Sequence, residues 1–334
     1  MENKDTGILK KFSNWFLEKQ ESSIIMILIL FVLLVECVNP KFLSSSNLFN
    51  VLRATGFSLI VVVGMSLVLI TGGLDLSVGS VYALGALICG MACAQWNIPV
   101  AIAILMGTLT GVIIGAVNGL LIVKTGIPPL IVTLGMQYIA RGLVSVLTKG
   151  VPIYPLPDSF IKIESTKIFG IVPVIVPIAV IIAICGHLLL SKTVFGRSVY
   201  AIGGNQEAAR ISGINIEKTK MGVYTLTGAL AAFAGVMMAS RLGSAEPSTG
   251  TALEMKIICG AIIGGVSTFG GMGTMLGAAL GALFMEALTN SLTLMRISVY
   301  WQNLVFGVVL ILSVILDQYK RVMLLRQSVK NTNA

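Results

Sequence analysis

The chain is poor in charge. Only 11% of its 334 residues are Asp, Glu, Lys or Arg, against roughly a quarter in an average soluble protein. Hydrophobic residues make up 56% of the chain, and the mean hydropathy is +0.94. This balance excludes a soluble enzyme and leaves little room for a separate aqueous domain.

The chain also lacks a histidine cluster, paired cysteines and a phosphate-binding loop. His187 is the single histidine, without a second histidine or an acid near it in sequence, so we expect a packed or interfacial side chain. The five cysteines lie in apolar stretches without the spacing of a zinc site or a disulfide framework, so no metal site is expected. No Gly-Lys dipeptide occurs, which excludes the loop G-x-x-x-x-G-K-[ST] and ATP hydrolysis by this chain itself.

Apolar runs of membrane-spanning length are abundant. The predicted spans are residues 24–38, 51–71, 77–95, 99–123, 127–148, 171–191, 219–240, 252–268, 274–293 and 299–318. Ten spans of about 20 residues fill about 200 residues, which is close to the apolar fraction. The runs therefore predict an all-α polytopic membrane protein, in contact with lipid, with about ten transmembrane helices.

The basic residues between these runs indicate orientation. Although the net charge is +9, these residues form no stripe with interleaved aromatics, so nucleic-acid binding is not expected. With the N-terminus inside, 14 of the 23 basic residues fall on the cytoplasmic side, six on the opposite side and three within spans. The positive-inside rule then places both termini in the cytoplasm.

Three regions are expected along the chain. Residues 1–23 carry apolar side chains at helical spacing among basic ones, which favours an amphipathic helix on the cytoplasmic membrane surface. Residues 24–318 are expected to form a single transmembrane domain. Residues 319–334 are expected to form a basic cytoplasmic tail.

The transmembrane domain divides into halves of five spans, 24–148 and 171–318. Because five is an odd number, related halves must have opposite orientations in the membrane. The segment DLSVGS (75–80) matches EPSTGT (246–251) at an offset of 171 residues, as an acid-x-Ser-x-Gly-hydroxyl pattern. The sequence therefore predicts two inverted five-helix halves, which would supply two related gates around a central path.

The polar residues of these two motifs have two open roles. Asp75 and Ser77, and likewise Glu246 and Ser248, are suited to satisfy the free N–H groups at a helix start. Alternatively, they line the ends of a translocation path and hydrogen-bond a hydroxylated solute. No predicted span contains a paired-carboxylate or acid–histidine arrangement that would suit a proton relay.

The segment 192–218 is expected to be a structured cytoplasmic loop. Within it Asn205 can cap a short helix, Glu207 favours the first turn, and Gly213 permits a left-handed exit. Two turns of isolated helix are marginal in water, so this helix needs a surface to pack on. A membrane protein without an ATPase of its own could use it as a lever, inserted into a groove of a separate ATPase.

Three segments together resemble the permease subunits of bacterial ribose- and galactoside-type ATP-binding-cassette (ABC) importers. They are GGLDLSVGS (72–80), KTVFGRSVYAIGGNQEAARISGINIEKTK (192–220) and GGVSTFGGMGT (264–274). The likeness extends from about residue 24 to residue 318. It implies a permease that imports ribose or a similar pentose or hexose through the bacterial inner membrane.

The resemblance also implies partners and site residues. The partners would be a second permease copy in a homodimer, an ATPase subunit with two fused cassettes that holds ATP and Mg²⁺, and a substrate-binding protein. No cofactor would bind to this chain. The implied coupling helix contains Asn205, Glu207, Ala208, Ala209, Arg210 and Gly213. Tight packing turns are expected at Gly72, Gly73, Gly264, Gly265, Gly270, Gly271 and Gly273, without a phosphate-binding role because no lysine accompanies them.

Two alternatives remain at this level. One is an ABC permease for a nucleoside or a branched-chain amino acid. The other is a self-sufficient secondary sugar transporter or a channel, for which the purified chain alone would support uptake that responds to ion gradients.

Overall fold

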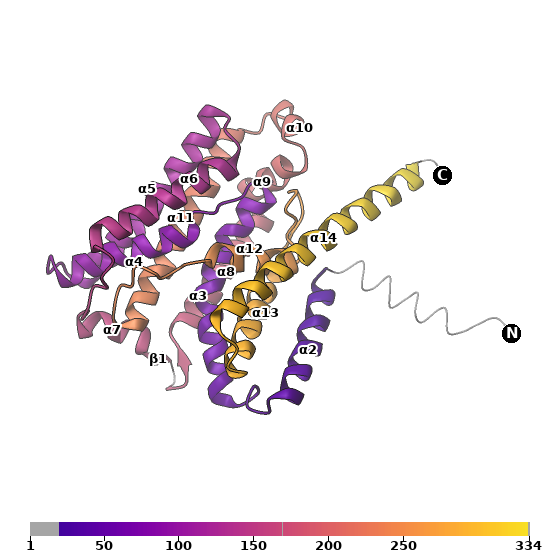
Figure 1. Ribbon diagram of the computed structural model, residues 1–334. Helices are drawn as coiled ribbons and strands as arrows, with labels where there is room; N and C mark the ends of the chain where they lie inside the picture. The colour runs from indigo at the N-terminus through magenta and orange to yellow at the C-terminus, as the bar shows by residue number, and fades with distance from the viewer. Residues whose placement is uncertain (1–19, 169, 333–334) are drawn as a thin grey trace.

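The computed structural model describes residues 20–168 and 170–332, which form a helical bundle (Figure 1). In this part of the chain each apolar run contains one helix. These helices are α2 (Gln20–Val38), α3 (Ser45–Ile70), α4 (Val78–Ala94), α5 (Val100–Thr125), α6 (Pro129–Thr148), α8 (Ile175–Lys192), α11 (Ile216–Leu242), α12 (Leu253–Ile263), α13 (Met275–Leu294) and α14 (Val299–Thr332). The amphipathic segment expected over residues 1–23 lies outside the described residues, except for its last four.

The remaining elements are short and lie in two connections. They are α7 (Asp158–Ser165), β1 (Lys167–Ile168), β2 (Val172–Pro173), α9 (Val194–Gly204) and α10 (Gln206–Ile211). Figure 1 shows α10 at one end of the bundle and α7 with β1 at the other, which we call the α10 end and the α7 end. The loops that join the long helices therefore gather at two opposite ends, as a membrane protein requires.

Seven helices among the described residues are long and apolar enough to cross a membrane. They are α3, α5, α6, α8, α11, α13 and the part of α14 from Val299 to Tyr319. The apolar parts of α2 (Ile24–Val38) and α4 (Val78–Ala94) are shorter, and α12 has only 11 residues. The all-α polytopic class is thus confirmed, whereas the number of ten spans stays a prediction.

Two helices are shorter than the sequence predicts. The run 171–191 begins with strand β2, which pairs with β1 in an antiparallel hairpin, so α8 starts only at Ile175. The run 252–268 is helical only as far as Ile263, because Gly265 takes a φ of +89° and turns the chain. Composition does not reveal the start of α8, because residues 171–174 are as apolar as the helix they join, whereas residues 264–268 are two glycines and three residues of which two are polar.

The centre of the bundle is formed by α3 and α11, and α3 is buried on every side from Thr55 to Ile70. Helix α11 packs against α3, α4 and α5 through small residues. A Cβ atom added at Gly111 of α5 would collide with the carbonyl oxygen of Gly228 of α11, and the reverse also holds. Small residues let helix backbones approach closely where lipid offers no hydrophobic driving force.

The close contact between α5 and α11 predicts opposite changes in thermal stability for two glycine-to-alanine substitutions. We expect Gly111→Ala to lower the thermal midpoint of the detergent-solubilised protein, because the methyl group must push two backbones apart. Gly142→Ala is the matched control, because Gly142 in α6 has open space around it. Alanine stabilises a helix by about 1 kcal/mol over glycine, so the control should be neutral or more stable. Equal midpoints for the two variants would contradict this packing.

Candidate functional site

Asparagine side chains cap the starts of helix α10 and of helix α11, which follows it. The carboxamide oxygen of Asn205 accepts hydrogen bonds from the backbone N–H groups of Glu207 and Ala208, each at 3.0 Å. Beyond the helix, Gly213 takes a φ of +81°, and Asn215 caps the start of α11. The sequence predicted both the cap at Asn205 and the left-handed exit. The caps fix a six-residue helix that would not be stable alone.

The two faces of α10 differ sharply in exposure. Ala209 is only 3% exposed and faces the permease, whereas Ile211 is 87% exposed. Glu207 and Arg210 form an ion pair at 3.5 Å on the exposed surface. The sequence grouped Ala209 with the contact residues and did not single out Ile211. The signal for Ile211 was present, since it follows Glu207 and Ala208 at helical spacing.

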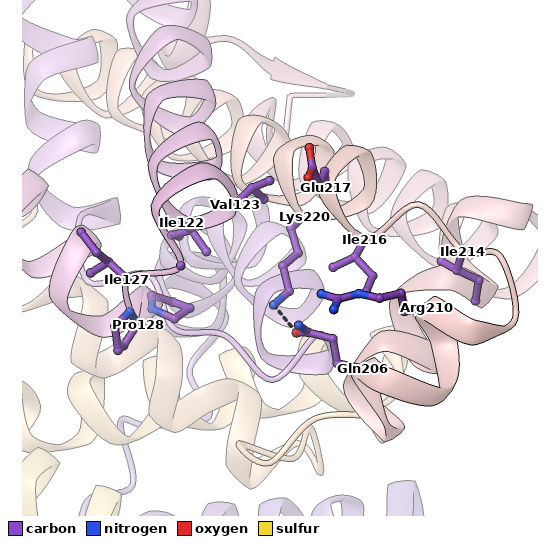
Figure 2. Close-up of a pocket in the computed structure, with 12 residues that line it drawn as sticks. Ile122, Val123, Ile127, Pro128, Gln206, Arg210, Ile214, Ile216, Glu217 and Lys220 are labelled. Atoms are coloured by element: carbon purple, nitrogen blue, oxygen red, sulfur yellow. Dashed lines mark hydrogen bonds between the residues drawn. The ribbon is translucent and has the colours of Figure 1, made fainter.

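A cavity of about 470 Å³ lies beside α10 (Figure 2). Its apolar lining includes Ile122 and Pro128 near the α5–α6 turn. Its polar lining includes Arg210 and Lys220, and the Lys220 ammonium donates a hydrogen bond to the Gln206 side-chain oxygen at 2.7 Å. Figure 2 shows the Arg210 guanidinium pointing toward these two side chains. The cavity thus combines an apolar wall with two cationic groups and the carboxylate of Glu217.

The first acidic motif lies deep in the protein at the α10 end. One Asp75 carboxylate oxygen accepts hydrogen bonds from the Ser77 N–H at 2.9 Å and the Ser77 hydroxyl at 2.6 Å. Asn118 donates to the same hydroxyl at 3.0 Å, and all three residues are at most 1% exposed. Burial raises the pKa of Asp75 to about 6, although both hydrogen bonds from Ser77 act in the opposite direction. Among the described residues the Asn118 side-chain oxygen has no hydrogen-bond partner, but burial leaves none of the three side chains accessible to a solute.

The second acidic motif is more open and lies toward the α7 end. Glu246 is half-buried and accepts a hydrogen bond from the Ser244 hydroxyl at 2.9 Å, while Ser248 is exposed. The side-chain caps expected from these motifs are absent at the starts of α4 and α12. Ser77 precedes α4 and Ala252 precedes α12, and neither side chain accepts a capping hydrogen bond. The motifs therefore match in sequence but differ in burial.

The two motifs touch each other inside the bundle. Gly79 and Gly250 occupy equivalent motif positions, and a Cβ atom at either would collide with the carbonyl oxygen of the other. Arg141 of α6 joins both segments: its guanidinium donates to the carbonyl oxygens of Pro247 at 2.8 Å, Thr249 at 2.9 Å and Gly79 at 3.2 Å. Pro247 and Thr249 lie in the non-helical segment between α11 and α12, where regular helical hydrogen bonds are missing, whereas Gly79 lies in the first turn of α4.

A second cavity, of about 320 Å³, adjoins the second motif. Polar side chains from the motif, α12 and α14 line it, and these are Thr249, Thr251, Lys256, Gln302 and Asn303. Lys256 is paired with Glu286 of α13 at 2.8 Å. An aqueous path through a membrane protein is lined by such hydroxyl, amide and ammonium groups.

The seven glycines predicted as packing turns lie in two loops at the α10 end. Gly72 and Gly73 follow α3, and the other five lie in the loop 264–274 between α12 and α13. Left-handed φ values of +75°, +89°, +86° and +74° occur at Gly72, Gly265, Gly270 and Gly271. A Cβ atom at Gly264 would collide with the backbone of Gly277 in α13.

A bundle of long apolar helices that packs two polar motifs against each other and displays a capped helix at one end is a polytopic membrane protein. The chain belongs to the family described as branched-chain amino acid transport system / permease component, and the match covers residues 47–314. Membership makes it a transport component of an ABC importer, which works with an ATPase and a substrate-binding protein, and a multi-pass protein of the bacterial inner membrane.

Individual relatives match along almost the whole chain. The ribose import permease protein RbsC of Escherichia coli is 38% identical over 92% of this chain and 95% of its own length. The autoinducer 2 import system permease protein LsrC of an Enterobacter species is 36% identical over 90% of this chain and 86% of its own. The L-arabinose ABC transporter permease protein AraH of Azospirillum brasilense is 34% identical over 92% and 90%. The resemblance predicted from the three motifs is confirmed, and no solved structure matches the chain.

Proposed function

We propose that this chain is the permease subunit of an ABC importer that carries ribose or a similar pentose or hexose through the bacterial inner membrane. The observation that carries the proposal is similarity over nine-tenths of the chain to permeases named for ribose and L-arabinose. ATP and Mg²⁺ bind to the partner ATPase, which has two fused cassettes, and this chain binds no cofactor. Two permease copies form a homodimer, to which a binding protein delivers the sugar.

The topology that goes with this function has ten spans in two inverted halves. Helix contacts support it, because counterparts in the two halves pack alike: α5 lies on α11 as α13 lies on α3. In the same way, α4 contacts α5 and α6, while α12 contacts α13 and α14. The contact between Gly79 and Gly250 is also what a two-fold relation between the halves would give at its axis. The α10 end and both termini face the cytoplasm in this arrangement.

Helix α10 is the element that meets the ATPase. Asn205 and Gly213 define its ends, Ala209 seats it on the permease, and its exposed residues face the ATPase groove, namely Glu207, Ala208, Arg210 and Ile211.

The two acidic motifs divide the remaining roles between them. Asp75 and Ser77 hold the start of α4, since they are buried and hydrogen-bonded to each other. Glu246 and Ser248 lie at the outer mouth of the sugar path, beside the 320 Å³ cavity lined by Thr249 and Thr251. Hydroxyl and carboxylate groups at this mouth suit a polyhydroxylated solute.

Affinity isolation of the chain from its own membrane tests the proposal. We expect an ATPase with two fused cassettes and a binding protein to co-purify, and the binding protein to titrate with ribose or another pentose or hexose. Leucine and adenosine serve as controls for the alternative ABC solutes. Binding of leucine or adenosine without any sugar would contradict the solute class. ATP-independent uptake by the purified chain alone would contradict the importer mechanism.

A further inference from the structure

The glycine-rich loop 264–274 touches three parts of the bundle at the α10 end. It leaves α12 at Gly264, enters α13 after Thr274, and is closed by a hydrogen bond from the Ser267 N–H to the Met272 carbonyl oxygen at 3.0 Å. Part of the loop is packed inside the protein, since Val266 and Ser267 are at most 1% exposed, whereas Phe269 is 40% exposed. The proposed function gives this loop no task.

Helix α9 lies directly against the loop. A Cβ atom at Gly203 would collide with the Ile70 carbonyl oxygen and the Gly271 nitrogen. The backbone of α9 therefore packs directly against the end of α3 and the loop. The Gly271 N–H donates to the Ile70 carbonyl oxygen at 2.8 Å. The Tyr200 hydroxyl donates to the Gly273 carbonyl oxygen at 2.7 Å. Because a single residue, Asn205, separates α9 from α10, a displacement of α10 reaches the loop through these contacts.

Helix α14 is hydrogen-bonded to the same loop through Asp317. One carboxylate oxygen of Asp317 accepts hydrogen bonds from the Ser267 hydroxyl at 3.1 Å, the Thr268 N–H at 3.1 Å and the Thr268 hydroxyl at 3.0 Å. Three donors on one charged acceptor form a strong, directional attachment. Asp317 therefore fixes α14 to a loop whose other face is packed on α9.

We propose that the loop 264–274 transmits the motion of the coupling helix to α12, α13 and α14, with Asp317 as the positioning residue that attaches α14. This inference rests on the proposed function, because it takes α10 as the contact with the ATPase. Close-packed backbones do not absorb a displacement by compression, so a shift of α9 moves the loop and the helices attached to it. Those helices carry Lys256, Gln302 and Asn303 of the cavity at the α7 end.

The test uses the complete importer, with ATPase and binding protein, reconstituted in proteoliposomes. Sugar uptake and ATP hydrolysis are measured together, and the readout is the number of sugar molecules imported per ATP. We expect Asp317→Asn and Tyr200→Phe to leave complex assembly and ATP hydrolysis near the wild-type level. The number of sugar molecules imported per ATP should fall in both variants, by about tenfold in Asp317→Asn. Both substitutions keep the shape of the side chain and remove only charge or one hydrogen bond.

A glycine pair gives the matched control. Gly203→Ala should lower the ratio, because its methyl group would meet backbone atoms of α3 and the loop, whereas Gly204→Ala should not, because Gly204 has open space around it. An unchanged ratio in Asp317→Asn would overturn the loop's role, as would a parallel loss of assembly, uptake and hydrolysis, which indicates a purely structural contact. Equal effects of the two glycine variants would also overturn it. A wild-type complex without ATP-dependent uptake would instead refute the proposed function, and the inference with it.

Discussion

Replacement of Ile211 by aspartate is expected to release the ATPase from the permease. Ile211 is 87% exposed at the end of α10, on the surface that the proposed contact with the ATPase would cover. Burial of an isoleucine contributes about 1.5–3 kcal/mol, so its loss alone weakens Kd by at least about tenfold. An aspartate would add the cost of an unpaired charge in the contact. Co-purification and Kd of the ATPase for the detergent-solubilised permease measure the effect.

The matched control for this prediction is Ile211→Leu. Leucine keeps the volume and the apolar character, so ATPase binding should stay close to that of the wild type. Thermal unfolding of the isolated permease should be unchanged in both variants, because the side chain contacts solvent there. Wild-type ATPase affinity in Ile211→Asp would remove α10 from the contact. Ala209→Glu differs in mechanism, since Ala209 is buried and its replacement should unseat α10 from the permease itself.

The second large effect is expected at Arg141. Arg141→Met leaves the carbonyl groups of Pro247, Thr249 and Gly79 without the guanidinium that now pairs them. An unsatisfied polar group costs about 1–3 kcal/mol when it is fully buried. Pro247 and Thr249 are half-buried and Gly79 lies within α4, so we expect the variant to lose stability mainly through the first two carbonyl groups and to accumulate less in the membrane. Arg141→Lys should be intermediate, because one ammonium group cannot reproduce the planar fork of a guanidinium.

Ser145→Ala is the control on the same helix. Ser145 is exposed one turn beyond Arg141, and its hydroxyl bonds only to the Arg141 carbonyl oxygen of its own helix. The thermal midpoint and the fraction of monodisperse protein in detergent should match the wild type in Ser145→Ala and fall in Arg141→Met. A stable Arg141→Met variant would mean that the interrupted segments hold together without the guanidinium.

Much of the fold could be predicted because it depends on local properties. Long apolar runs predict membrane helices, and caps such as Asn205 predict where a short helix begins. The boundaries of α8 and α12 were harder, since strand β2 lies within the apolar run 171–191 and the turn at Gly265 lies within the predicted run 252–268. Period and hydropathy do not distinguish a helix from a buried turn of the same composition.

The contacts of the candidate site were harder to predict, because they join residues far apart in the sequence. Arg141 stands out in the sequence as a charge within an apolar run, but Asp317 and Arg141 act on partners that lie 50 and 106 residues away, so no local pattern reveals their contacts. The inward position of Ala209 depends on the surface on which α10 lies, which six residues cannot specify. The two acidic motifs match in sequence, but only their places in the fold separate the buried Asp75 from the open Glu246.

The three hydrogen bonds of Arg141 also constrain when the first half of the protein can complete its packing during synthesis. Pro247 follows Arg141 by 106 residues, which a ribosome adds in about 5–20 s. During that interval α6 must hold a charged guanidinium without two of its three acceptors, so the first half cannot reach its final packing before α11 and the loop after it have entered the membrane. The two halves are therefore completed together, and a pause in translation between them would leave the nascent chain exposed to membrane quality control.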